Sequence, residues 1–95
     1  MIDNELLIEC KKGLGISVSS TNFDGPLLQK ILTVKTYMLG AGISEEILNS
    51  DLAVGTIVVG VTDIWNIQSG TIKFSPIFYD FATQLAIKSL PDEVV

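Results

Sequence analysis

The stretch from Asp51 to Gln68 constrains the fold more than any other part of the chain, because most of its positions are apolar. Its many β-branched residues would suit a buried strand. The apolar pattern nevertheless continues without a turn signal until Ser69-Gly70, and a run of about 17 residues is long for a strand but ordinary for a helix. We therefore predict a helix over residues 51–68. Because this helix is apolar on nearly all sides, it should be central, with neighbours packed around it.

The same stretch does not predict a membrane span. Its most apolar part, residues 52–61, is ten residues long, whereas a span needs about 20. Gly55 and Gly60 lie inside it and fit tight packing points in a bundle; alternatively, they let another helix approach closely.

Apolar residues at spacings of three and four predict further helices before this stretch. Residues 4–12 form a short helix, whose last turn carries two lysines that suit the helix dipole. A long helix follows Asp24-Gly25-Pro26, with Asp24 or Gly25 as its cap, and ends at the glycine-rich residues 40–42. The stripe of the long helix consists of Leu27, Ile31, Val34 and Met38, and it is widened by Leu28, Leu32 and Leu39.

The remaining elements are indicated by serine caps. A serine-capped helical turn is expected at residues 44–48. Ser75 caps the last helix, with Pro76 in its first position and its stripe running to Leu90. Residues 71–74 form a brief extended piece before it.

These elements predict an all-α fold class, a small bundle of about four to five helices with a short extended segment before the last helix. At 95 residues the chain has room for one domain. Residues 1–90 form this helical domain, and residues 91–95 form a short acidic C-terminal tail.

The residue types argue against catalysis. The chain has no histidine, so it lacks the commonest general base and the usual nitrogen ligand of zinc. Its single cysteine, Cys10, lies on the apolar face of the first helix, where a buried thiol is the expected state. Phosphate-loop and dinucleotide motifs are absent, and no acids show calcium-loop spacing. We predict no enzyme activity, no cofactor and no metal site.

Charge and hydrophobicity favour protein contacts over nucleic-acid contacts. Six lysines, no arginine and eleven acids give a net charge of -5, which repels phosphate backbones. Hydrophobic residues make up 47% of the chain and charged residues 18%, against a usual charged share of about 25%. The surplus of hydrophobic side chains indicates an apolar surface that contacts a partner, or simply a well-filled core.

The C-terminal third holds most of the aromatic residues, which are enriched at the centres of protein contacts. Asp63 and Asp80 lie near these aromatic residues. We expect each to form an inter-subunit hydrogen bond or a salt bridge with a lysine, or else to remain solvated. Phe74 is also expected to contact Tyr79 across the start of the last helix. The candidate interface residues are Asp63, Trp65, Ile72, Phe74, Tyr79, Asp80, Val94 and Val95.

The order of these pieces resembles the head-tail connector, or adaptor, proteins of tailed bacteriophages. The resemblance covers most of the chain. It is carried by the opening helix at residues 4–11, by Tyr-Met-Leu-Gly-Ala-Gly-Ile at 37–43, by Val-Thr-Asp-Ile-Trp-Asn at 61–66, and above all by Ser-Gly-Thr-Ile-Lys-Phe-Ser-Pro-Ile-Phe at 69–78.

This resemblance implies a structural virion protein, assembled in the cytoplasm of the host bacterium and located at the head-tail junction. It would be a homo-oligomer, typically a dodecameric ring, between the portal protein and a head-closure, neck or tail protein. Double-stranded DNA would pass through the ring as non-specific cargo, and no membrane would be involved. The segment after the last helix is very short for the family, which puts in doubt how far it reaches into the portal.

A small helical regulatory or nucleic-acid-binding domain is the alternative, because helix-loop-helix orders also occur there. The lack of a basic patch weakens the nucleic-acid-binding alternative, because nothing would attract the phosphate backbone. An enzyme would need its chemistry from Asp, Lys, Ser or Tyr alone.

Overall fold

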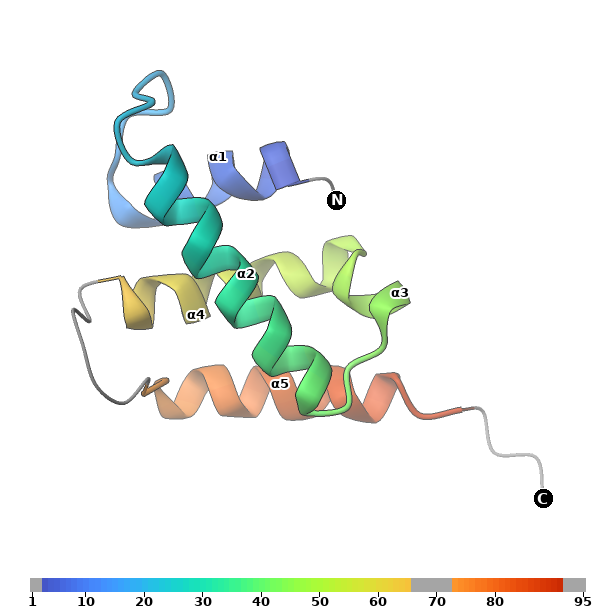
Figure 1. Cartoon of the computed structure of the whole chain (residues 1–95). Coiled ribbons are helices and arrows are strands. Elements are labelled where there is room, and N and C mark those ends of the chain that lie inside the picture. Colours follow the sequence, from blue (N-terminus) through green and yellow to red (C-terminus); the bar gives the residue numbers. More distant parts are fainter. Residues whose placement is uncertain (1–2, 66–72, 92–95) are drawn as a thin grey trace.

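The computed structural model describes residues 3–65 and 73–91, and these residues form an all-α bundle, which confirms the predicted fold class. A short 3-10 helix, η1, precedes the fourth α-helix (Figure 1). The elements are α1 (Asp3–Leu14), α2 (Asp24–Gly40), α3 (Glu45–Leu48), η1 (Asp51–Ala53), α4 (Val54–Ile64) and α5 (Pro76–Lys88).

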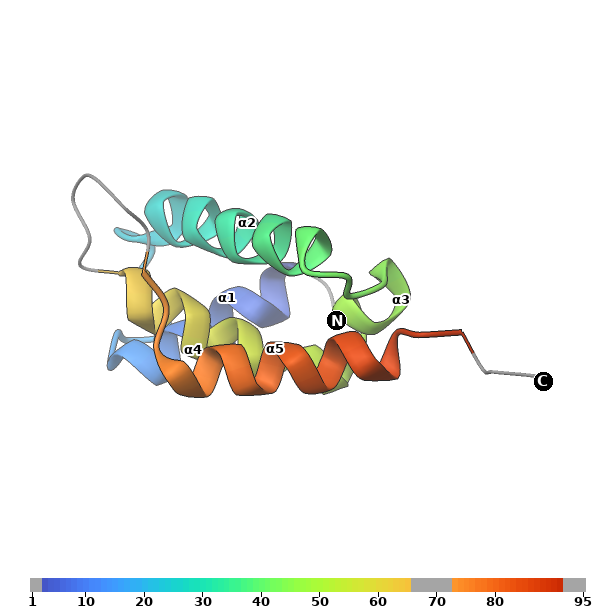
Figure 2. The ribbon, with the colours of Figure 1, turned by 90° about the horizontal axis from the view of Figure 1, so that it is seen from below.

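The helices are arranged in two layers. α2 lies on one side of the bundle and crosses α1, α4 and α5, which lie behind it in Figure 1 and below it in Figure 2. α4 contacts α1, α2 and α5, and is therefore the central helix that its apolar sequence predicts. The prediction of a helix in this stretch is thus confirmed over residues 54–64, whereas residues 51–53 form η1 instead.

The core lies between α2 and the other helices. Gly60 of α4 is the point of closest approach, because a Cβ atom there would lie 2.6 Å from Phe78 Cε1 and 2.9 Å from Val34 Cγ1. Gly60 therefore lets α2 and α5 both pack directly against the α4 backbone. Gly55 has open space around it and makes no such approach. The largest fully buried side chains are Leu6, Cys10, Leu27, Val34, Met38, Ile43, Ile57, Val61, Ile64 and Phe78.

Serine caps fix the N-terminal starts of α3 and α5, as predicted. The Ser44 hydroxyl accepts a hydrogen bond from the Ile47 N–H, and the Ser75 hydroxyl accepts one from the Phe78 N–H. Gly42, with a φ of 97°, provides the left-handed backbone that turns the chain after α2. α5 ends at Lys88, two residues before the predicted end at Leu90.

The predicted cap of α2 is wrong. Phe23 occupies the N-cap position, and Asp24 is already inside the first turn. Instead of capping, the Asp24 Oδ1 atom lies 2.8 Å from the Lys11 Nζ atom. Lys11 also donates to the carbonyl oxygens of Val18 (3.3 Å) and Ser20 (2.6 Å). A single buried ammonium group thus attaches the connecting segment to the end of α1.

Two further predictions concern the last third of the chain. The extended piece at 71–74 lies mostly outside the described residues, and its described end has neither helix nor strand. The tail at 92–95 and the end of the predicted helix, at 66–68, also lie outside them. Among the residues that the structure covers, no helix is long and apolar enough to cross a membrane.

Candidate functional site

The single thiol is sealed in the core, as the sequence predicted. Cys10 is fully buried. Burial, with a smaller contribution from the Glu9 carboxylate, raises the pKa of the Cys10 thiol to about 11, so the thiol stays protonated at neutral pH. Among residues 3–65 and 73–91, no group of three or more His, Cys, Asp or Glu side chains could hold a metal ion.

Four aromatic rings meet between the end of α2 and the start of α5. Phe74 stacks on Phe78 with ring centroids 4.2 Å apart, and Tyr37 lies 5.0 Å from Phe74. Phe74 also contacts Tyr79 at 6.2 Å, which confirms the expected contact across the helix start. Phe74 and Phe78 are buried, whereas Tyr37 and Tyr79 remain partly exposed at the rim. Desolvation, together with the neighbouring Tyr79 hydroxyl, raises the pKa of Tyr37.

Asp63 has an intrachain role at this cluster. Its Oδ2 atom accepts hydrogen bonds from the Ser75 N–H (2.9 Å) and the Ser75 hydroxyl (2.7 Å). This carboxylate therefore ties the end of α4 to the start of α5. The sequence offered no sign of it, because the two residues are twelve positions apart and no local pattern links them.

The other candidate interface residues are not brought together. Trp65 contacts Phe23 edge-to-face at 6.0 Å, at the end of α4. Asp80 is exposed on α5. Ile72, Val94 and Val95 lie outside the described residues. The eight candidates therefore do not form one continuous site among the described residues.

The outer face of α2 carries apolar side chains that the sequence had assigned to the core. Leu32 is 61% exposed, and Leu28 and Leu39 are about two-fifths exposed. A helix advances about 100° per residue, so these residues, one position after the buried stripe, turn out of the core. We call Leu28, Leu32 and Leu39 the α2 apolar face. Leu28 and Leu32 also line a hollow of about 350 Å³ on this face, together with Gln29, Ile31 and Lys35.

A second apolar feature lies between α4 and α5. This groove has a volume of about 230 Å³, and Leu52, one of its lining residues, is 57% exposed. Sequence reasoning missed it, because it depends on how two helices are placed in space. We call it the α4–α5 groove, and its lining consists of Leu52, Gly55, Thr56, Phe81, Gln84, Leu85 and Lys88.

No protein-family model, curated protein or solved structure matches the chain.

Proposed function

We propose that this protein is a non-catalytic ring subunit of the head-tail junction of a tailed bacteriophage or of a phage-derived particle. In this role identical copies form a ring between the portal protein and a head-closure or neck protein, and the genome passes through the ring. The proposal rests on the resemblance of residues 4–11, 37–43, 61–66 and 69–78 to the connector family.

The observation that carries the assembly role is the amount of apolar side chain left on the outside of so small a bundle. Large hydrophobic residues on α2, η1 and α5 are more than two-fifths exposed. Monomeric soluble proteins rarely expose contiguous apolar patches larger than about a few hundred Å², and larger patches mark contacts with a partner. The most exposed large hydrophobic residues are Leu32, Leu52, Ile77 and Ile87, together with Leu90 just after α5.

The charge of the chain is consistent with a DNA conduit. A net charge of -5 with no arginine favours passage of DNA over tight binding. A ring lined by such subunits would let the genome slide.

The test is assembly in the presence of a portal. The purified chain is combined with the portal protein encoded beside it, and the complex is measured by light scattering and viewed by negative stain. We expect rings that bind the portal vertex. A chain that remains a monomer at all concentrations and never binds the portal would contradict the proposal. Portal and capsid genes on one side of its gene, and neck and tail genes on the other, are also required.

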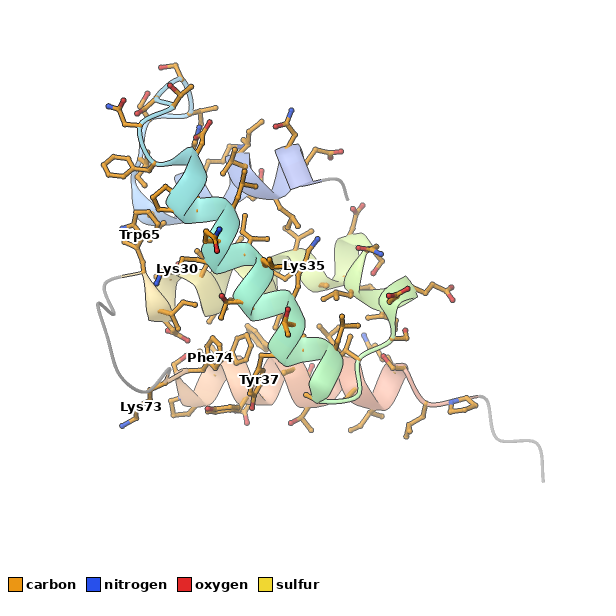
Figure 3. The ribbon with its side chains drawn as sticks, viewed as in Figure 1. Lys30, Lys35, Tyr37, Trp65, Lys73 and Phe74 are labelled. Carbon is orange, nitrogen blue, oxygen red and sulfur yellow. The ribbon has the colours of Figure 1, made fainter. Side chains whose placement is uncertain are left out.

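A nucleic-acid-binding domain is the second candidate, favoured by one feature of the surface. Lys30 and Trp65 are seen on the same side of α2, and Lys73 and the partly exposed Tyr37 lie further along that side, whereas Phe74 is buried (Figure 3). Lysines combined with exposed aromatic rings are components of single-strand binding sites. Tight DNA binding that weakens steeply with salt would favour this candidate, and its absence would remove it.

A further inference from the structure

The end of α1 places a buried ammonium group among three oxygens of the segment that follows it. The Lys11 side chain is 4% exposed. Its Nζ atom lies 2.6 Å from the Ser20 carbonyl oxygen and 3.3 Å from the Val18 carbonyl oxygen. The third neighbour is Asp24 Oδ1, at 2.8 Å. A lysine ammonium group has three N–H donors and no acceptor, so the oxygens match the donors in number. We call these three oxygens the oxygen cradle.

The backbone that carries the oxygen cradle has hydrogen bonds of its own. The Ser20 N–H donates to the Ser17 carbonyl oxygen (3.0 Å), and the Asp24 N–H donates to the Thr21 carbonyl oxygen (3.3 Å). These two turns form between α1 and α2, where the chain reverses (Figure 1). Because both turns use main-chain groups only, shortening the Lys11 side chain should leave the cradle oxygens close together.

The chemistry of the oxygen cradle calls for a cation. Two carbonyl oxygens and a carboxylate oxygen can only accept hydrogen bonds, so they cannot satisfy one another. Buried acceptors without a partner are unfavourable, and most buried polar groups in proteins have one. The Asp24 carboxylate adds a negative charge, and hydrogen bonds between ionised groups are stronger than those between neutral groups. A cationic donor therefore fits this position better than a water molecule.

The distances in the oxygen cradle select the class of cation. Calcium lies about 2.3–2.6 Å from its oxygen ligands and magnesium about 2.0–2.1 Å, whereas the Asp24 and Val18 oxygens lie 2.8 and 3.3 Å from the occupying nitrogen. These are distances typical of an N–H donor. The Asp24 side chain is 32% exposed, so the cradle lies close enough to solvent for a small ion to enter.

We propose that the oxygen cradle is a binding site for a primary ammonium group. Lys11 fills this site in the native chain, and a free alkylammonium ion fills it when the Lys11 side chain is shortened. Lys11 thus acts as a built-in ligand that holds residues 15–23 against α1. This inference goes beyond the proposed function and does not depend on it, because it concerns the fold of a single copy.

The first experiment restores the missing group to the full-length Lys11→Ala variant. This substitution removes the outer carbons and the nitrogen, which together correspond to propylammonium. Propylammonium chloride is titrated, and stability is measured by urea and thermal unfolding. A ligand that binds only the folded chain should lower the unfolding equilibrium constant about elevenfold at ten times its Kd. Neither 1-propanol, which lacks the charge, nor tetramethylammonium chloride, which lacks N–H donors, should stabilise more than sodium chloride does.

The matched control is Lys12→Ala. Lys12 is the neighbouring lysine, its side chain is 60% exposed, and it pairs with Glu9 on the same helix. This variant and the wild type should not respond to propylammonium. Replacing Asp24 by Asn in the Lys11→Ala chain should weaken propylammonium binding at least about fivefold, because a neutral acceptor replaces a charged one.

A second variant covers the case in which Lys11→Ala does not fold. Lys11→Met keeps an apolar stem and leaves only the position of the nitrogen empty, so its matched probe is ammonium chloride compared with sodium chloride. A gain in stability that only the matched ammonium ion gives supports the binding site. The proposal is overturned if neither variant gains stability, if tetramethylammonium or sodium stabilises equally, if Lys12→Ala responds to the same extent, or if Asp24→Asn leaves propylammonium binding unchanged.

Discussion

Replacing Gly60 with Ala adds one methyl group at the point where three helices meet. The new Cβ would lie 2.6 Å from Phe78 Cε1 and 2.9 Å from Val34 Cγ1, far inside the roughly 3.5 Å of a relaxed carbon contact. Neither neighbour can move easily, because both are fully buried and the Phe78 ring is stacked on Phe74. Gly60→Ala should therefore strain the core.

The magnitude follows from two opposing effects. An extra methyl group in a packed core costs about 1–3 kcal/mol, whereas replacing glycine by alanine inside a helix gains up to about 1 kcal/mol. Gly55→Ala is the matched control in the same helix, because it gains the helix propensity without any contact within 4 Å. The free energies of unfolding of the two variants should thus differ by about 1–3 kcal/mol, with Gly60→Ala the less stable.

The assay is urea and thermal unfolding followed by circular dichroism, at two protein concentrations tenfold apart so that self-association is recognised. In a domain of this size each kcal/mol corresponds to about 4–8 °C in Tm. Gly60→Ala should melt at least about 4 °C below Gly55→Ala. Equal stabilisation of both variants would show that α2 and α5 do not approach α4 closely at Gly60, and the packing described here would be wrong.

Three further predictions concern single contacts. Cys10 should not react with a thiol reagent at pH 8 until the chain unfolds, and rapid labelling of the native protein would contradict its burial. Because the pKa of the thiol is raised from 9.0 to about 11, its contribution to stability is complete below about pH 9 and is lost as the pH rises toward 11. Lys11→Met should lower the free energy of unfolding by about 2 kcal/mol, because it leaves the partly exposed Asp24 and two carbonyls without their donor. It should also accelerate cleavage after Phe23 by chymotrypsin, and an unchanged cleavage rate would refute the role of this contact. Ser75→Ala should lower the free energy of unfolding by about 1 kcal/mol through loss of the cap. In a double-mutant cycle with Asp63→Ala, the two effects should be non-additive by more than about 0.5 kcal/mol. Additivity would argue against the hydrogen bond between the two side chains.

The features that sequence predicted well are local ones. Ser44 and Ser75 are recognisable as caps because a cap depends on residues within three positions. The length of the apolar stretch predicts a helix over residues 51–68 despite its β-branched residues, and α4 is helical over residues 54–64 within it. Packing at the centre of the bundle outweighs strand propensity there. The turn after α2 was readable from its glycines, and Gly42 adopts the left-handed conformation that glycine favours.

The features that sequence could not predict depend on neighbours distant in the chain. Leu28, Leu32 and Leu39 look like core residues until the number of helices that cover α2 is known. Lys11 suits the end of a helix in any sequence, and its burial against the connecting segment follows only from the fold. The sequence predicts a surface position or a subunit contact for Asp63, but its partner is Ser75, twelve positions further along the same chain.

The Lys11 contacts also have a consequence for the order of folding. Val18, Ser20 and Asp24 follow Lys11 by seven, nine and thirteen residues, so a short loop closes at low entropic cost and on a timescale of about 10–100 ns. Docking of α5 joins far more distant residues, such as Ser44 and Ser89, which are 45 positions apart. We infer that α1, residues 15–23 and the start of α2 organise in the transition state before α5 docks. Substitution of Lys11 should then slow folding, whereas Ser89→Ala should mainly accelerate unfolding, and stopped-flow kinetics that showed the reverse would reject this order.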